Sequence, residues 1–145
     1  MAFKLNISEN GKAWKLEIES EFLVGKSVGD KFDGKEIKPE LEGYELEITG
    51  GSDSAGFPMF KEVSGIGLKK VLFKKGWGMH DPKDGIRRKK TVRGKTISSA
   101  VSLINMKVIN AGKKPLNEIF LDQNKVETEK KEEKKEVAVA QLAAG

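Results

Sequence analysis

The stretch Tyr44-Glu45-Leu46-Glu47-Ile48-Thr49-Gly50-Gly51 alternates apolar and polar side chains and then ends in two glycines. Because successive side chains of a β-strand point to opposite faces, the alternation predicts a strand with one buried face, ended by Gly50-Gly51. The same alternation runs from Phe3 to Ile7 and from Trp14 to Ile18. Between these two runs lies Glu9-Asn10-Gly11-Lys12, a turn sequence that predicts an N-terminal hairpin.

Further apolar runs extend the β pattern along the chain. Residues 68–73 and 103–109 predict two more strands, and glycines separate the strands at short intervals. This spacing favours a small closed or partly open β-barrel. Short helical turns are expected around Lys38–Leu41 and Ser98–Ser102, and no long amphipathic helix is expected before residue 113. The predicted fold class is therefore mainly β, with one or two short helices.

The composition excludes several functional classes. The 145 residues include no cysteine and a single histidine, His80, so neither a disulfide framework nor a structural zinc site is expected. No apolar run approaches the ~18 residues of a membrane span, and we expect an intracellular protein without a membrane partner. Paired carboxylates and nucleophile–base sets are not recognisable, so the sequence predicts no catalytic residue, no cofactor and no small-molecule substrate.

The formal net charge of +5 is unevenly distributed. Residues 1–60 carry 7 basic and 12 acidic side chains, whereas residues 61–95 carry 12 basic and 3 acidic ones. A concentrated positive block creates a local field that attracts polyanions, and nucleic acid is the first such partner to consider. A solvated basic face without a partner is the alternative. The acidic first 60 residues are expected to face solvent or a protein neighbour.

The strongest signal in this block is Arg87-Arg88-Lys89-Lys90-Thr91-Val92-Arg93-Gly94-Lys95, in which six of nine residues are cationic. Cations that neutralise phosphates release condensed counterions and so drive binding. Trp77 stands between glycines after two lysines, which suits stacking on an unpaired base or packing in a core. The predicted RNA-binding residues are Lys69, Lys70, Lys74, Lys75, Trp77, His80, Lys83, Arg87, Arg88, Lys89, Lys90, Arg93 and Lys95.

A glycine loop precedes the basic block. Gly51 and Gly56 have the four-residue gap of a phosphate-binding loop, but Phe57-Pro58 stand where such loops carry lysine and a hydroxyl, which excludes nucleotide-phosphate chemistry. Two alternatives remain, a loop whose backbone approaches an RNA phosphate and a plain tight turn. Under the first alternative, the residues that would face RNA are Gly50, Gly51, Ser52, Asp53, Gly56, Phe57, Pro58 and Met59.

The character of the chain changes near its end. Residues 125–136 are nearly all Lys and Glu with like charges four apart, and an alanine-rich segment follows. Because this region has no apolar face to bury, it is expected to be disordered or to form a helix on a partner. The predicted organisation is a β-barrel domain that binds RNA over residues 1–122 and a charged tail over residues 123–145.

Three stretches together resemble the small-subunit ribosomal protein S6e family of archaea and eukaryotes. They are Leu5–Ser8, Tyr44–Met59 and Arg87–Gly94, in matching order and spacing, and the resemblance covers about residues 2–122. It implies a structural component of the small ribosomal subunit whose β-barrel body lies on ribosomal RNA. Eukaryotic members continue into a long basic helix with phosphorylatable serines. The short neutral tail here looks archaeal instead, so kinase regulation is not implied.

We therefore expect a non-enzymatic, ribosome-bound protein of the cytoplasm. It would bind ribosomal RNA of the small subunit through residues 61–95, contact neighbouring ribosomal proteins, and support subunit assembly and translation. Recognition would rest on the phosphate backbone and RNA shape rather than on base edges. One alternative is a free RNA-binding accessory factor of translation. Another is an enzyme on a barrel scaffold, which would need acid–base groups near His80, Asp81 or Asp53.

Overall fold

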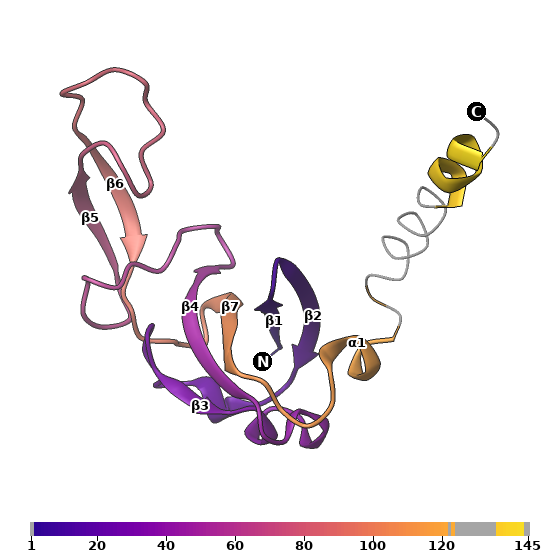
Figure 1. Ribbon diagram of the computed structural model, residues 1–145. Coiled ribbons are helices and arrows are strands. Elements are labelled where there is room, and N and C mark those ends of the chain that lie inside the picture. The colour runs from indigo at the N-terminus through magenta and orange to yellow at the C-terminus, as the bar shows by residue number, and fades with distance from the viewer. Residues whose placement is uncertain (1, 122, 124–135, 144–145) are drawn as a thin grey trace.

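The main sheet has five strands in the order β2-β1-β7-β4-β3, shown in Figure 1. The structure is a computed structural model that describes residues 2–121, 123 and 136–143. The strands of this sheet are β1 (Phe3–Glu9), β2 (Lys12–Ile18), β3 (Lys31–Asp33), β4 (Glu45–Asp53) and β7 (Val101–Asn110). The mainly β class predicted from the alternating runs is confirmed.

The N-terminal hairpin is confirmed, and it occupies one side of the main sheet. β1 pairs antiparallel with β2 from Phe3–Ile18 to Glu9–Lys12. β1 also pairs in parallel with β7, from Lys4–Leu103 to Ser8–Lys107. This second pairing places β1 inside the sheet, which explains why every apolar residue of its alternating run is fully buried.

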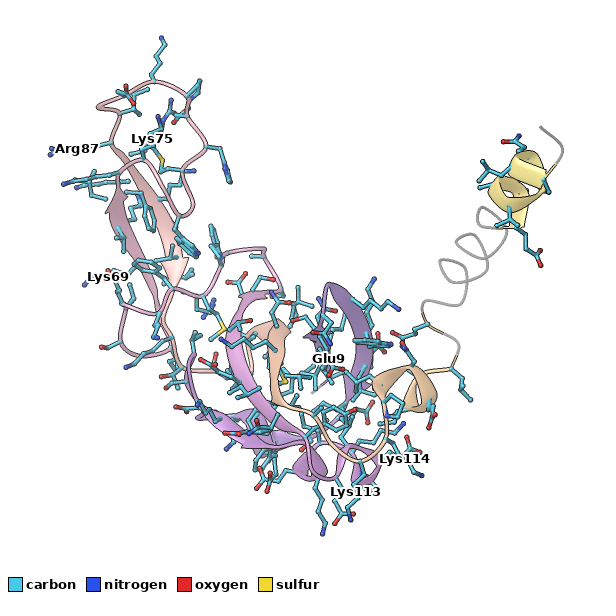
Figure 2. The ribbon with its side chains drawn as sticks, viewed as in Figure 1. Glu9, Lys69, Lys75, Arg87, Lys113 and Lys114 are labelled. Carbon is cyan, nitrogen blue, oxygen red and sulfur yellow. The ribbon has the colours of Figure 1, made fainter. Side chains whose placement is uncertain are left out.

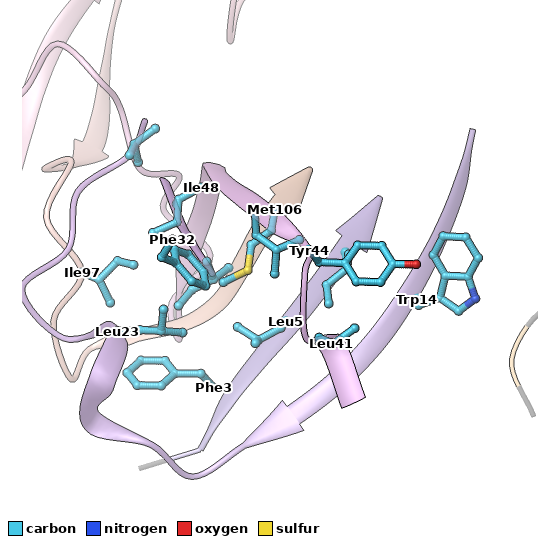
Figure 3. Close-up of a cluster of buried hydrophobic side chains, with 14 of the residues drawn as sticks. Phe3, Leu5, Trp14, Leu23, Phe32, Leu41, Tyr44, Ile48, Ile97 and Met106 are labelled. Atoms are coloured by element: carbon cyan, nitrogen blue, oxygen red, sulfur yellow. The ribbon is translucent and has the colours of Figure 1, made fainter. Parts of the chain in front are cut away.

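One hydrophobic core packs against the main sheet (Figure 3). Alternation places one face of each strand in this core, because side chains at every second position share a face. Phe32 and Tyr44 bring the chain around β3 into the same cluster. The most deeply buried members are Phe3, Leu5, Ile7, Leu23, Leu41, Tyr44, Leu46, Ile48, Ile97, Ile104, Met106 and Leu116.

The predicted barrel is wrong, because the sheet does not close. β2 and β3 are its two edges and do not pair with each other. The side-chain amide of Gln123 covers part of the β2 edge, since it accepts from the Lys15 N–H and donates to the Lys15 carbonyl, both at 2.6 Å. The strand predicted at 68–73 does not join the main sheet but forms a separate sheet, β5 (Leu68–Phe73) with β6 (Arg88–Arg93).

β4 does not end at Gly50-Gly51 as predicted but continues to Asp53. Its pairing with β7 shifts between Ile48 and Gly50 and again between Ser52 and Asp53. A β-carbon on Gly51 would lie 2.3 Å from the Leu103 carbonyl oxygen, whereas one on Gly50 would meet nothing within 4 Å. Gly51 therefore permits a close backbone approach inside the sheet rather than stopping the strand.

The helical segments between residues 2 and 121 are short. Three are 3₁₀ turns, η1 (Glu21–Leu23), η2 (Gly34–Glu36) and η3 (Pro39–Leu41), and one is an α-helical turn, α1 (Leu116–Ile119). The helical turn expected around Lys38–Leu41 is thus present. The one expected around Ser98–Ser102 is reduced to a single turn, closed by the Val101 N–H donating to the Ser98 carbonyl at 3.1 Å, because Val101 already begins β7. In the described part of the chain, no long helix precedes residue 113.

The tail is only partly described. Residues 136–143 are helical and exposed. The Lys/Glu run from 125 to 135 lies outside the described residues, so the expectation that it is disordered or forms a helix on a partner stays a prediction. No helix in the described ranges is long and apolar enough to cross a membrane.

The two neighbouring glycines of β4 offer a matched test of the bulged strand. We expect Gly51→Ala to lower the free energy of unfolding by about 1–3 kcal/mol, because overpacking against a fixed backbone carbonyl forces the strand to shift. Gly50→Ala meets open space and should change stability by less than about 0.5 kcal/mol. Denaturant unfolding of both variants measures the difference, and equal stabilities would contradict the close approach at Gly51.

Candidate nucleic-acid interface

The basic block folds into a hairpin that projects from the main sheet (Figure 1). We call residues 68–93 the basic hairpin. β5 and β6 pair antiparallel from Leu68–Arg93 to Phe73–Arg88. The strand predicted at 68–73 is confirmed, and the cationic run after Arg87, for which no conformation was predicted, forms its partner. Because these two strands pair, cations that are about 20 residues apart in the chain lie together on one ribbon.

A small core of its own holds the basic hairpin together. Val63, Phe73, Met79 and Val92 are buried in this cluster, with Phe60, Val71 and Ile86 packed against it. Residues directly opposite each other in an antiparallel pair share a face, so Val71 and Phe73 lie on the face of Val92. Leu68 and Leu72 occupy the other face and are about half exposed.

Several cations of the basic hairpin are bound within the protein. In the loop from 74 to 87, Lys75 Nζ lies 3.0 Å from Asp84 Oδ1, and Arg88 Nε lies 2.9 Å from Asp81 Oδ2. Lys90 Nζ donates to the Gly78 carbonyl at 2.7 Å. These side chains are still largely exposed, so each of them combines a loop-ordering contact with a charge that remains accessible to solvent.

Other cations have no ion pair within the described residues. The side chains of Lys69 and Arg87 extend away from the ribbon (Figure 2). Lys95 is only partly exposed, whereas His80 is exposed in the loop. The exposed cations of the basic hairpin with neither an ion pair nor a side-chain hydrogen bond in the described ranges are Lys69, Lys70, Lys74, Lys83, Arg87 and Lys89.

Arg93 has a different role, because it joins the two sheets. Its Nε and Nη2 atoms both lie 2.9 Å from Asp53 Oδ2, and Nη1 donates to the Ile66 carbonyl at 2.9 Å. The Arg93 and Asp53 side chains are 14% and 2% exposed. Arg93 ends β6 and Asp53 ends β4, so this buried ion pair links the basic hairpin to the main sheet. Its guanidinium is committed to this contact and presents little surface to a ligand.

The contact between Arg93 and Asp53 is the joint between the basic hairpin and the main sheet, and the glycine loop supplies the remaining contacts of this joint. Asp53 Oδ1 accepts the Phe57 N–H at 2.9 Å, and the Met59 N–H donates to the Gly51 carbonyl at 2.9 Å. The Arg93 N–H then donates to the Pro58 carbonyl at 2.8 Å. Asp53 and Met59 are buried, whereas Gly50, Gly51, Ser52 and Phe57 are partly exposed and Gly56 and Pro58 are exposed. The Gly56 N–H also donates to the Asp53 carbonyl at 3.1 Å, so the loop contains a tight turn, and the approach of its backbone to RNA stays a prediction.

The pKa of Asp53 reflects these contacts. Burial alone raises the pKa of the Asp53 carboxyl. The hydrogen bond from the Phe57 amide, the hydrogen bond and charge of Arg93, and the Ala55 amide lower it by more, so that it lies below its ordinary value of 3.8. The carboxylate is therefore ionised at neutral pH, and the ion pair is intact there.

The side chains that an enzyme would use are not arranged as an acid–base site. Asp53 is held by Arg93, and Asp81 is held by Arg88. His80 is exposed in the loop. In the described part of the chain, no three His, Cys, Asp or Glu side chains gather as a metal site would require.

Sequence reasoning missed the joint between the two sheets, although a signal for it was present. Both motifs that carry the family resemblance contain one buried charge, Asp53 in the glycine loop and Arg93 in the basic element. Opposite charges in two unusual motifs predict a contact between the motifs. Because Arg93 was placed among the RNA-binding cations, its pairing with Asp53 was not predicted.

The described architecture is a mainly β body that carries a projecting basic hairpin. The amino-acid sequence of the chain is similar to those of known proteins. The family described as ribosomal protein S6e matches residues 1–121. The chain is 47% identical over 118 residues to small ribosomal subunit protein eS6 of Methanococcus maripaludis strain C7, covering 80% of this chain and 94% of that protein. The eS6 protein of Methanothermobacter thermautotrophicus is 48% identical over 123 residues, covering 83% and 96%. The eS6 protein of Methanosphaera stadtmanae is 39% identical over 132 residues, covering 89% and 100%. The chain belongs to the ribosomal protein S6e family.

The buried ion pair predicts a specific pH dependence of stability. At neutral pH we expect Asp53→Asn to lower the free energy of unfolding by about 3 kcal/mol, because it leaves the buried Arg93 charge uncompensated. The pKa of Asp53 is lowered in the folded protein, so its contribution is fully present above the ordinary value of 3.8 and is lost as the pH falls through the folded pKa.

Denaturant unfolding of wild type and Asp53→Asn across acid pH measures this effect. The stability difference should be constant at neutral and mildly acid pH and should shrink below about pH 4. Asp33→Asn is the matched control, since Asp33 is exposed and its side chain makes no cap hydrogen bond. A difference that stays unchanged down to the acid limit would contradict the role assigned to the Asp53 charge.

Proposed function

We propose that the chain is a structural constituent of the small ribosomal subunit and binds its ribosomal RNA through the basic hairpin. The supporting observation is the separation of charge between the two parts of the fold. Residues 68–93 carry 10 basic and 2 acidic side chains, whereas residues 1–60 carry 7 and 12. The positive charge is therefore concentrated on a ribbon that projects from an acidic body (Figure 2).

The contacts proposed with RNA are mainly electrostatic. Cationic side chains neutralise phosphates and release counterions, which supplies affinity without reading sequence. The exposed lysines on both strands suit the backbone of an RNA helix, whose shape and phosphates are more accessible than its base edges. Arg87 adds a guanidinium that can hold a phosphate with two hydrogen bonds. Lys75, Arg88 and Lys90 add charge close to the loop that they also order.

The glycine loop has a supporting part in this proposal. Its buried residues position the basic hairpin, and only its exposed tip around Gly56 and Pro58 is proposed to approach the RNA backbone. The acidic surface of the body, including Glu36 and Glu40, faces away from RNA toward solvent or neighbouring ribosomal proteins. In this role the protein supports subunit assembly and translation in the cytoplasm without catalysing a reaction.

A charge-matched pair of variants tests this proposal. Changing Lys69, Lys70, Arg87 and Lys89 to glutamine removes four cations that make no ion pair within the described ranges. We expect weaker binding to small-subunit ribosomal RNA and a salt slope reduced by up to about 3.6, because each of the four lost phosphate contacts contributes about 0.9 for a duplex. Affinity measured over a range of salt concentrations gives both quantities.

The control removes the same charge from the body, at the exposed Lys4, Lys15, Lys31 and Lys113. This variant should keep the wild-type salt slope and should enter small subunits in one copy during reconstitution. The hairpin variant should enter poorly. If the two variants lose affinity equally, the RNA contact is not confined to the basic hairpin. If wild type is recovered only in substoichiometric, salt-labile amounts with subunits, an accessory factor replaces the structural role.

A further inference from the structure

Trp77 is an exposed aromatic side chain held in a fixed position. Its turn is closed by the Met79 N–H, which donates to the Gly76 carbonyl at 3.1 Å. Gly78 has φ +72°, a left-handed conformation that turns of this kind require and that glycine adopts without strain. Met79 anchors one end of the turn in the small core, and Lys90 binds the Gly78 carbonyl. The indole is therefore fixed without being buried.

Among the described residues, the rings that contact Trp77 lie on one side of the indole, because Phe60 and Phe73 also contact each other, with centroids 5.2 Å apart. The Phe60 ring stacks on Trp77 with centroids 4.8 Å apart and planes 30° apart. Phe73 is tilted against it at 5.6 Å. Trp77 nevertheless remains 54% exposed. A ring covered on one face and half exposed presents its other face to solvent, so these contacts leave a flat aromatic platform supported from behind.

The surroundings of this platform are positively charged. Lys74 and Lys75 precede the turn, and the Lys90 ammonium lies 2.7 Å from the Gly78 carbonyl oxygen. Arg88 follows on the same ribbon, opposite Phe73 in the strand register. A partner that fits this place is flat, aromatic and attached to a negative charge. A nucleotide has these properties, whereas an apolar protein side chain would satisfy the indole but not the adjacent cations.

We propose that the open face of Trp77 stacks on an unpaired base of the RNA that the basic hairpin binds. Bases inside an A-form helix have no free face, so the partner is a bulged, looped or terminal nucleotide beside a helical segment. This inference rests on the proposed function and adds to it. Phosphate contacts alone do not require an unpaired nucleotide, whereas stacking on Trp77 does. Stacking tolerates every base, so the preference is for an unpaired nucleotide rather than for a sequence.

Two short RNA hairpins test the platform directly, one fully paired and one with a single bulged adenosine. Trp77 fluorescence should be quenched by the bulged RNA and little changed by the paired RNA, because stacking requires contact with the indole face. Trp77→Phe provides the blank for the other tryptophan, Trp14, which is buried. The comparison of the two RNAs uses the wild-type protein, so only the blank depends on a variant.

Affinity provides the second measurement. Trp77→Ala should weaken binding of the bulged RNA by about tenfold, the order expected for loss of one stacked base, and should leave binding of the paired RNA unchanged. Trp77→Phe should retain most of the preference, since phenylalanine keeps an aromatic face. Lys35→Gln is a control on the body, far from the basic hairpin in sequence and exposed.

The outcomes separate the two proposals. If wild type binds both RNAs equally without quenching and Trp77→Ala matches it, the platform is overturned while RNA binding by the basic hairpin stands. If wild type binds neither RNA nor small-subunit ribosomal RNA, the proposed function itself fails. Equal losses of both RNAs in Trp77→Ala, without quenching in wild type, would assign Trp77 a structural role and also overturn the platform.

Discussion

The buried ion pair between Asp53 and Arg93 is the contact on which the arrangement of the molecule depends. It joins the last residue of β4 to the last residue of β6 at 2.9 Å, and both side chains are almost removed from solvent. A buried pair of this kind requires further hydrogen bonds to offset desolvation, and the Phe57 amide and the Ile66 carbonyl provide them. The glycine loop and the basic element, which look like two separate motifs in the sequence, are the two halves of one joint.

This joint gives the basic hairpin a defined direction relative to the main sheet. A hairpin alone is marginally stable in water, and its own core of four buried residues is small. Backbone hydrogen bonds from Arg93 to Pro58 and from Phe60 to Arg93, together with the ion pair, fix its base. A ribbon held in this way can present a row of like charges away from the body, at a distance from the acidic side chains of the first 60 residues.

Local patterns predicted the individual strands but not how they assemble. The alternation around Leu5 and Leu46 and the turn at Asn10-Gly11 act over a few residues, and the strands they predicted are present, although β4 continues past its predicted end to Asp53. The parallel pairing of β1 with β7 joins residues about 100 positions apart, and no local signal specifies it. The spacing of the glycines suggested a barrel. Gly51 instead allows the β4 backbone to approach Leu103 of β7 closely, and the chain leaves the main sheet after Asp53 without closing it. The cationic block was recognised from composition, whereas the fold was needed to show that the Arg93 side chain is largely enclosed in an ion pair and that Lys89 is exposed.

The most direct measurement places a photo-crosslinking residue at single positions of the chain in assembled small subunits. Crosslinkers at Lys89 on the basic hairpin and at Glu36 on the acidic body sample the two faces, and both positions are exposed. The RNA-anchoring role predicts crosslinks to ribosomal RNA from position 89 and none from position 36. Crosslinks to RNA from position 36, with none from position 89, would contradict it.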